Sequence, residues 1–263
     1  MDVFDLDRTL VRDYEQFARS FTTIRATDIK KQVEQIYANN KFWPEPLVSI
    51  NPNFKKGASL PELVAEGTIH PRTEQVFRKN GQPMTLYRHQ STAVAKASAK
   101  QSFIVTTGTG SGKSLCFFIP IVDAVIRARV AGEQRRTRAI VVYPMNALAN
   151  SQMNELDGYI QQSGLAEDIK PTFARYTGQE EQEERERIRN RKPDIILTNF
   201  MMLELLLTRQ NDRDREVIDN AQGLDFIVLD ELHTYRGRQG ADVAMLIRRL
   251  RDRLCQASRA RVG

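Results

Sequence analysis

Residues 103–114 read FIVTTGTGSGKS, and this stretch decides how the surrounding chain folds. The first four residues form a buried-strand pattern, and the apolar run that follows residue 114 predicts a helix. Between them, three glycines let the backbone turn tightly and direct several N–H groups at one point. The positive end of the following helix is directed at the same point. The stretch therefore predicts a phosphate-binding loop between a strand and a helix.

This loop is expected to bind ATP with Mg²⁺. Lys113 supplies a mobile positive charge for the β- and γ-phosphates, and the Ser114 hydroxyl is a ligand for Mg²⁺. The predicted ATP-binding residues of the loop are Thr107, Gly108, Thr109, Gly110, Ser111, Gly112, Lys113 and Ser114. Thr107 departs from the glycine or alanine usual at the first position, which shapes the turn and donates no charge. The alternative, a glycine–serine linker, does not account for the flanking strand and helix patterns.

Short β-rich runs alternate with helical patterns from about residue 84 onward. The strand patterns cover 103–106, 139–143, 172–176, 194–198 and 226–229. The helical patterns lie near 113–130, 146–162, 180–190, 200–208 and 239–254. This alternation predicts right-handed crossovers and a mostly parallel sheet covered on both faces, the α/β class. In such sheets, ligands bind at the carboxyl ends of the strands.

A second group of chemically active side chains follows the strand pattern at 226–229. Asp230, at the strand tip, can hold Mg²⁺ through water. Glu231 can orient or deprotonate an attacking water. A pair of carboxylates after a strand also occurs as a helix cap, but the upstream phosphate loop favours a metal and water site.

The sequence predicts a helical accessory segment over residues 1–83 and the α/β domain over residues 84–263. Helical spacing of apolar residues covers 10–21 and 29–37, followed by a proline-rich stretch at 43–53. Ser59 with Glu62 three residues later predicts the capped start of a further short helix. The charged run at 180–191 (EEQEERERIRNR) predicts a solvated helix face with ion pairs three and four residues apart.

Composition excludes several classes of protein. The acidic first residues lack a signal peptide's apolar core, and the longest apolar run, 115–122, is too short to cross a bilayer. Two cysteines give neither a zinc site nor a disulfide framework. We therefore expect a cytoplasmic protein without a membrane partner. The net charge of +6 is compatible with a polyanionic partner but does not establish one.

Asp-Glu-Leu-His at 230–233 resembles the second, DExH motif of superfamily 2 helicases and translocases. The resemblance implies a RecA-like domain in which Lys113, Asp230, Glu231 and His233 are catalytic. Residues 87–90 (YRHQ) look like the glutamine motif of that family, which implies that Gln90 recognises adenine. The amide of Gln90 has the donor and acceptor that this base edge requires. The continuation HTYRG at 233–237 is similar to YprA-type bacterial helicases, several of which serve DNA repair or phage defence.

Three further motifs occur in the order typical of this family. Residues 143–152 are similar to motif Ia, 176–178 to the glycine motif after it, and 196–203 to the next. In the family these motifs contact the sugar–phosphate backbone of one strand, without recognising base sequence. The resemblance therefore implies nucleic-acid contacts by Pro144, Asn146, Thr177, Gly178, Thr198 and Asn199.

The family's third motif, typically Ser-Ala-Thr, is expected soon after residue 255 and does not occur in this sequence. We therefore expect a sheet that is incomplete at its C-terminal end. A second RecA-like domain is expected from the same protein or from a partner chain. Such a domain supplies an arginine finger worth about 10³- to 10⁵-fold in rate, so residues 1–263 alone are expected to hydrolyse ATP weakly.

These observations favour the ATP-binding half of a helicase or translocase that acts on nucleic acid, with DNA preferred. A double-strand translocase has every motif present here. A second class is a nucleotide-switched scaffold that binds nucleic acid in a repair or defence complex without unwinding it. A small-molecule kinase with a phosphate loop explains neither Gln90 nor the ordered motifs.

Overall fold

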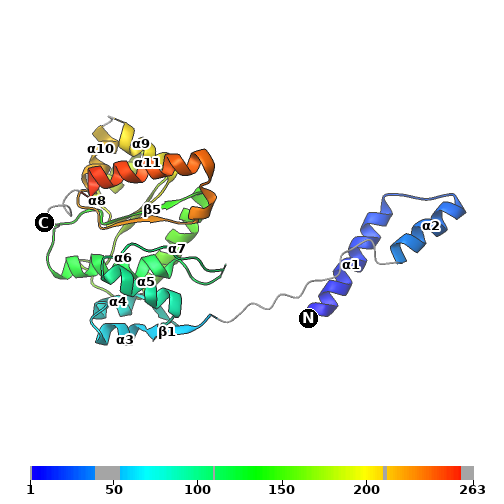
Figure 1. The fold of residues 1–263 in the computed structure, drawn as a ribbon, viewed down its shortest axis with the longest axis horizontal. Helices are drawn as coiled ribbons and strands as arrows, with labels where there is room; N and C mark the ends of the chain where they lie inside the picture. Colours follow the sequence, from blue (N-terminus) through cyan, green and yellow to red (C-terminus); the bar gives the residue numbers. More distant parts are fainter. Residues whose placement is uncertain (1, 39–53, 109, 210–211, 256–263) are drawn as a thin grey trace. The chain divides into compact units, whose positions relative to one another are not determined.

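The computed structural model describes residues 2–38, 54–108, 110–209 and 212–255. The chain forms two compact units, Met1–Asn53 and Phe54–Gly263 (Figure 1). The domain boundary expected between residues 83 and 84 falls inside the second unit. The proline-rich stretch at 43–53 and Thr109 lie outside the described residues.

The first unit contains the two helices that the apolar spacing predicts, α1 (Val3–Ser20) and α2 (Thr27–Ala38). Asp2 caps α1, because its carboxylate accepts a hydrogen bond of 3.3 Å from the Phe4 amide. The Arg19 guanidinium lies 4.8 Å from the centre of the Tyr37 ring, which brings the C-terminal ends of the two helices together.

The second unit is built on a parallel sheet of four strands, in the order β6 (Phe173–Tyr176), β7 (Ile195–Asn199), β5 (Ala139–Tyr143) and β8 (Phe226–Leu229). Its helices are α6 (Leu115–Val130), α7 (Asn146–Gln162), α8 (Gln182–Arg191), α9 (Phe200–Thr208), α10 (Asp212–Asp219) and α11 (Gly237–Leu254). In Figure 1, α6 and α7 lie on one side of the sheet and α9 and α11 on the other. The α/β class and four of the five predicted strands are confirmed.

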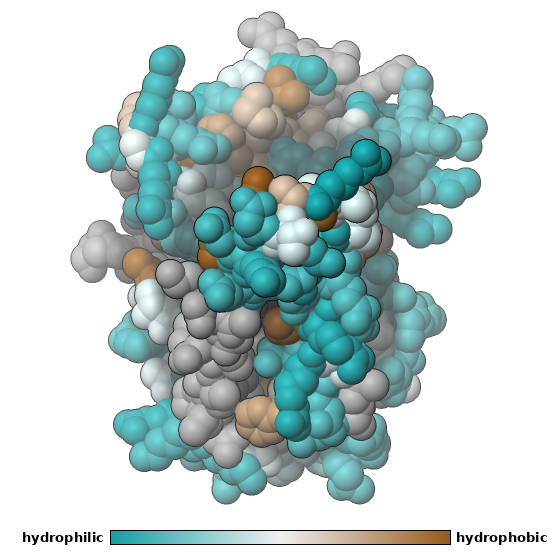
Figure 2. Space-filling view, turned by 90° about the vertical axis from the view of Figure 1, so that its right-hand side faces the viewer, coloured by the Kyte–Doolittle hydropathy of each residue, from teal (hydrophilic) through white to brown (hydrophobic). Residues whose placement is uncertain are grey.

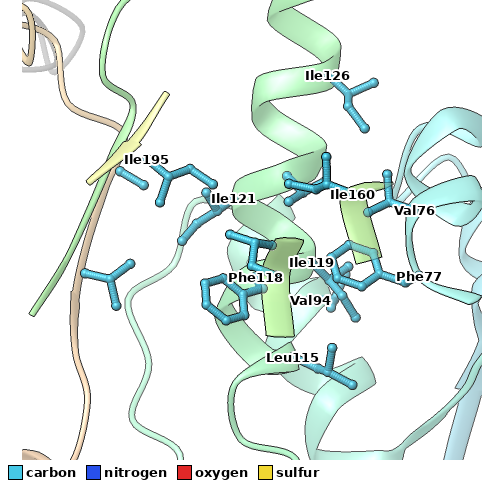
Figure 3. Close-up of a cluster of buried hydrophobic side chains, with 14 of the residues drawn as sticks. Val76, Phe77, Val94, Leu115, Phe118, Ile119, Ile121, Ile126, Ile160 and Ile195 are labelled. Atoms are coloured by element: carbon cyan, nitrogen blue, oxygen red, sulfur yellow. The ribbon is translucent and has the colours of Figure 1, made fainter. Parts of the chain in front are cut away.

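Side-chain alternation along β5 divides the core into two clusters. Val141 and Tyr143 pack in the cluster that contains α6 and α7, whereas Ile140 and Val142 pack in the cluster that contains α9 and α11. Figure 3 shows the first cluster around α6, with Ile121 near Ile195 of β7. All five side chains of β5 are buried, as expected for a central strand of a covered parallel sheet.

The strand predicted at 103–106 does not form. Residues 101–108 take part in no strand ladder among the described residues, and the Ile104 side chain is 76% exposed. A strand needs a neighbour to complete its backbone hydrogen bonds. Strand β8 is at the edge of the described sheet and pairs there with β5 alone. The residue pattern is a local property, and it does not indicate whether a pairing partner is present.

A layer of short elements precedes the sheet in the second unit. They are β1 (Lys56–Ser59), α3 (Leu60–Ala65), α4 (Pro71–Val76), β2 (Arg78–Lys79), β3 (Gln82–Pro83), β4 (Thr85–Tyr87) and α5 (Arg88–Ser98). The predicted cap of α3 is confirmed, because Ser59 and Glu62 form a reciprocal capping box. Strand β1 pairs antiparallel with β4. A Cβ on Gly57 would lie 2.8 Å from Arg88 Cα, so only glycine lets β1 approach the start of α5 this closely.

Buried Asp123 ties this layer to the rest of the unit. Its carboxylate on α6 accepts hydrogen bonds from the His70 amide at 2.6 Å, the Thr73 hydroxyl at 2.7 Å and the Arg127 guanidinium at 2.6 Å. These contacts explain why residues 54–83 belong to the same compact unit as the sheet.

Apolar side chains appear only as small, separate patches among hydrophilic ones on the face drawn in Figure 2. Within the described ranges, no helix combines the length and the apolar character needed to span a membrane.

Candidate functional site

The phosphate loop is held by contacts between its own residues. The Thr107 and Ser111 hydroxyls lie 2.7 Å apart, and Lys113 Nζ donates to the Thr107 carbonyl at 3.2 Å. Gly110 and Gly112 have φ angles of +74° and +68°, which only glycine adopts without strain. Thr107, the departure from the usual motif, thus helps to close the loop.

Gln90 connects the glutamine motif to this loop. Its side chain is buried, with Oε1 accepting from the Tyr87 amide at 2.8 Å and Nε2 donating to the Gly112 carbonyl at 2.9 Å. A Cβ on Gly112 would lie 2.6 Å from this Nε2, which is a second reason for glycine there. The contact with adenine remains a prediction. The support that Gln90 gives to the loop was not visible in the sequence.

A groove of about 460 Å³ lies beside the loop, between α5 and residues 103–107. Its lining includes three cations, Lys55, Arg88 and Lys96, and the His89 ring. His89 Nε2 is 2.9 Å from the Ser111 carbonyl oxygen, so the groove adjoins the phosphate loop. Sequence reasoning missed this basic lining, because Lys55 is distant in sequence from the basic residues of α5.

The DExH segment begins where β8 ends. The Asp230 amide donates to the Val142 carbonyl at 3.0 Å, and Asp230 Oδ1 accepts from the Glu231 amide at 2.9 Å. Burial raises the pKa of the Asp230 carboxyl, and Lys113 is close enough to oppose this rise. The phosphate-loop lysine therefore lies within electrostatic range of the DExH carboxylate.

Glu231 is held in a strained backbone conformation, with φ +48° and ψ 43°. A non-glycine residue in this left-handed region costs about 1–3 kcal/mol, and such strain is concentrated at functional sites. Glu231 Oε2 lies 3.1 Å from His233 Nδ1, so the histidine fixes the direction of the carboxylate. The Thr234 hydroxyl donates to the Glu231 carbonyl at 2.8 Å and supports the turn.

The motifs predicted to contact nucleic acid meet at the carboxyl ends of β5, β6 and β7. Thr198 is fully buried and donates to the Tyr176 carbonyl at 2.6 Å. Asn199 Nδ2 donates to Asn146 Oδ1 at 2.7 Å and to the Thr177 carbonyl at 3.1 Å, and its Oδ1 caps α9. These polar side chains thus hold three loops in one arrangement. Their contacts with nucleic acid stay predictions.

Glu180 organises the loop at Thr177 and Gly178. Its buried carboxylate accepts from the amides of Thr177 at 2.9 Å and Gly178 at 2.8 Å, and from the Thr177 hydroxyl at 2.8 Å. Arg175 adds an ion pair of 2.9 Å. Gly178 has a φ of +91°, so consecutive amides point into one concave cradle that the carboxylate fills. The sequence placed Glu180 in a solvated helix, but α8 begins only at Gln182.

Large apolar side chains are also exposed after these strands and after β8. Met145 follows β5 with 59% exposure, Met201 follows β7 with 63%, and Leu232 follows β8 with 41%. Pro144 is half-buried beside Met145. Sequence reasoning did not single out the methionines, because exposure at a loop depends on the tertiary arrangement.

The model of the DEAD/DEAH box helicase family matches residues 87–262. The chain belongs to this family. The predicted resemblance and the RecA-like fold class are thereby confirmed, and the family's motifs account for the order of the loops described above.

The proteins to which this helicase domain is similar are much longer chains. YprA of Bacillus subtilis, an uncharacterized ATP-dependent helicase, is 33% identical over 207 residues, which cover 79% of this chain and 25% of YprA. HRQ1 of Saccharomyces cerevisiae, an ATP-dependent helicase, is 30% identical over 64% of this chain and 14% of its own length. The chain thus spans about a quarter or less of these relatives.

A solved structure of the DUF1998 helicase MrfA bound to DNA and AMPPNP matches with a TM-score of 0.63 and 30% identity. The match covers 86% of this chain and 29% of MrfA. The DEAD-box helicase Mss116, bound to ssRNA and AMP-PNP, matches with a TM-score of 0.60 at 18% identity, which supports the fold alone. The ATP-dependent relatives and the AMPPNP complex support ATP use by this helicase domain.

The residues near Asp230 suit a magnesium ion that is held mainly through water and nucleotide oxygens. The described residues contain no group of three carboxylate, histidine or cysteine side chains that could enclose a metal. Mg²⁺ is usually bound by one or two carboxylates with substrate phosphates and several waters. Ser114 and Asp230 supply such a partial set. The Tyr143 and Tyr235 hydroxyls are buried without a hydrogen-bond partner in the described structure, and the charge of Asp230 acts on both.

Proposed function

We propose that this chain is the ATP-binding half of an ATP-dependent helicase or translocase that acts on DNA. The observation that carries the proposal is that the charge of Lys113 acts on the Asp230 carboxyl, beside loops that the resemblance assigns to three nucleic-acid motifs. Nucleotide and polynucleotide would then bind along one edge of the sheet, so a change at one site can alter the other.

The residues of the phosphate site have distinct roles in this proposal. Lys113 neutralises charge on the β- and γ-phosphates, and Ser114 and Asp230 hold Mg²⁺. Glu231 orients the attacking water, and His233 keeps its carboxylate in place at 3.1 Å. The magnesium ion would supply positive charge against the phosphate oxygens.

The polynucleotide is proposed to lie across Pro144, Asn146, Thr177, Gly178, Thr198 and Asn199. Because the polar side chains among them bond to one another, these residues would act mainly by shaping loops that present backbone groups to a phosphate backbone. DNA is favoured because MrfA, which is 30% identical, was solved bound to DNA. The resemblance to YprA-type helicases extends the proposal to a cytoplasmic role in DNA repair or phage defence.

A second RecA-like domain, in the same protein or in a partner chain, would complete the motor. The chain spans about a quarter of YprA and MrfA, so much of each relative lies outside the matched region. An arginine finger from the second domain would raise the rate by about 10³- to 10⁵-fold.

The proposal is tested with residues 1–263 and with a longer protein that contains the second domain. Residues 1–263 should bind a fluorescent ATP analogue and hydrolyse ATP slowly, with little stimulation by DNA. The longer protein should hydrolyse ATP rapidly when single-stranded DNA is added. Absence of ATP binding by residues 1–263, or equal stimulation by DNA and RNA in the longer protein, would contradict the proposal as stated.

Glu231→Gln separates the motor from the alternative, a nucleotide-switched scaffold. In a motor, the variant keeps ATP binding and loses both hydrolysis and strand displacement. In a scaffold, the variant keeps ATP-dependent DNA binding and biological function. Glu181→Gln, at an exposed position outside the site, is a matched control.

A further inference from the structure

The Tyr143 hydroxyl is an unpaired polar group in the core of the second unit. The side chain is fully buried in the cluster that contains α6 and α7, yet its oxygen has no hydrogen-bond partner among the described residues. Leaving a buried hydroxyl unpaired costs about 1–3 kcal/mol. Most buried polar side chains in native proteins have a partner, so this one calls for an explanation.

Strand pairing places Tyr143 beside the magnesium site. Val142 of β5 is paired in register with Leu229 of β8, so the next residues along the two strands are Tyr143 and Asp230. The Asp230 amide donates to the Val142 carbonyl at 3.0 Å, which extends the pairing by one residue. In a parallel pair, neighbouring positions direct their side chains to the same face. Tyr143 and Asp230 therefore share the face that carries α6 and Lys113.

Two carboxylates act on the Tyr143 hydroxyl. Burial raises its pKa, and the charges of Asp230 and Glu155 raise it further. The hydroxyl therefore stays protonated at neutral pH, with a proton to donate and lone pairs to accept. Gln152 on α7 adds a second buried atom without a partner, Oε1, while its Nε2 donates to Glu155 at 3.2 Å.

Tyr235 is a second buried tyrosine on which the charge of Asp230 acts. Its hydroxyl is buried without a partner in the described structure, and burial together with the charge of Asp230 raises its pKa. Tyr235 follows the DExH segment, whereas Tyr143 ends β5. Two elements therefore each bring one unpaired hydroxyl to the same carboxylate.

We propose that the Tyr143 hydroxyl is a positioning residue for magnesium, and that it binds a water of the hydration shell at Asp230. This inference rests on the proposed function, since it requires Mg²⁺ with a nucleotide at Asp230. Magnesium keeps several waters when it binds nucleotides, and each of them needs partners outside the ion. The hydroxyl can accept a hydrogen bond from such a water and donate one to a carboxylate. Outer partners of this kind change metal affinity by about 10- to 100-fold.

Packing alone does not account for a tyrosine here. The ring fills the core space, and phenylalanine has the same ring without the unpaired oxygen. A hydroxyl that serves only the core would make the protein less stable than the phenylalanine variant. Tyrosine is useful at this position if the hydroxyl gains a partner when ligand binds.

The test compares Tyr143→Phe with a matched control, Tyr159→Phe, in the 1–263 chain. Tyr159 is half-buried on α7, where the charge of Glu155 acts on it, and its ring packs against Phe77. Two quantities are measured: the Tm without ligand, and the Mg²⁺ concentration at half-maximal binding of a fluorescent ADP analogue. Tyr143→Phe should leave the Tm unchanged or raise it, keep ADP affinity in EDTA, and raise the Mg²⁺ midpoint about 10-fold. Tyr159→Phe should leave the Mg²⁺ midpoint unchanged.

A lower Tm for Tyr143→Phe, including failure to fold, or an unchanged Mg²⁺ midpoint would overturn the inference. Failure of the proposed function looks different, because the unaltered chain would then show no Mg²⁺-dependent ADP binding at all.

Discussion

Around Asp230, two tyrosine hydroxyls are buried without a partner in the described structure and one backbone is strained, whereas in the loops proposed to contact nucleic acid the polar side chains bond to neighbouring groups. Tyr143 and Tyr235 have unpaired hydroxyls, and Glu231 has a left-handed backbone. Thr198 and Asn199, in contrast, direct their donors to neighbouring loops at 2.6–3.1 Å.

This difference reflects two ways of preparing a surface for a ligand. On the nucleotide side, unpaired hydroxyls and a strained backbone lower the stability of the free protein, and a ligand can remove this cost. On the nucleic-acid side, internal hydrogen bonds fix the loops before any ligand arrives. We therefore expect substitutions on the nucleotide side to change binding at constant stability. Substitutions on the nucleic-acid side should change stability first.

The largest expected effect is that of Glu180→Ala. Removing this carboxylate leaves the amides of Thr177 and Gly178 unpaired and Arg175 without its ion-pair partner. The free energy of unfolding should fall by about 3 kcal/mol, measured by urea denaturation at pH 7. Glu181→Ala, at the exposed neighbouring position, should change it by less than about 0.5 kcal/mol. Equal effects of the two variants would contradict the role of Glu180.

Lys113→Ala should weaken nucleotide binding and leave the stability of the free protein nearly unchanged. Losing charge-assisted contacts to phosphate should weaken ATP binding about 10- to 100-fold, measured by calorimetry. The free energy of unfolding without nucleotide should stay within about 0.5 kcal/mol, because Lys113 contacts only the Thr107 carbonyl among the described residues. Lys31→Ala, at an exposed site on α2, is the control. A large loss of stability in Lys113→Ala would contradict the expectation that substitutions on the nucleotide side change binding at constant stability.

Removing the Thr198 hydroxyl gives a smaller effect. Thr198→Val keeps the shape of the side chain but leaves the Tyr176 carbonyl without the bond of 2.6 Å. Stability should fall by about 1–2 kcal/mol in thermal denaturation. Tyr143→Phe also deletes a buried hydroxyl and should lose none. Similar losses of stability in Thr198→Val and Tyr143→Phe would contradict the proposed difference between the nucleotide side and the nucleic-acid side.

The smallest effect is the pH dependence of stability at Glu180. Burial raises the pKa of this carboxyl, but hydrogen bonds from its own backbone amide, from Thr177 and from Gly178 outweigh burial and hold the pKa below its usual value. The stabilisation is therefore complete above the unfolded pKa of about 4.3, and it is lost as pH falls through the folded value. The difference in stability between the unaltered protein and Glu180→Gln should shrink below about pH 4. A constant difference from pH 7 to pH 3 would contradict this account.

Sequence patterns predicted the positions of helices and strands well, but they predicted less well which strands pair with one another. The bounds of β8 and α7 match the predicted ranges 226–229 and 146–162, because strand and helix periodicity are local properties. Residues 103–106 were predicted as a strand but are unpaired, since a strand depends on a neighbour distant in sequence. The pairing of β1 with β4 was missed for the same reason.

The candidate site shows the same limit. Motif residues such as Lys113 and Asp230 were found because their spacing is characteristic of nucleotide-binding proteins. Glu180 was assigned to a charged helix, because composition does not show which carboxylate of an acidic run turns inward. The position of Tyr143 depends on the register between β5 and β8, which no local pattern encodes.

The amide group of Gln90, which is proposed to recognise adenine, already bonds to groups of the protein itself. Its Nε2 donates to the Gly112 carbonyl, and its Oε1 accepts from the Tyr87 amide. Nε2 also donates to the Ser111 carbonyl at 3.4 Å, so both of its N–H groups are engaged and a base that accepts from this amide must displace one of the two carbonyls. Hydrogen bonding to a base and the order of the phosphate loop would then compete for the same donor atom, Nε2. A nucleotide whose base cannot bond to Gln90 would leave this side chain hydrogen-bonded to the phosphate loop. Nucleotides with different bases would then differ in the mobility of the loop as well as in their affinity.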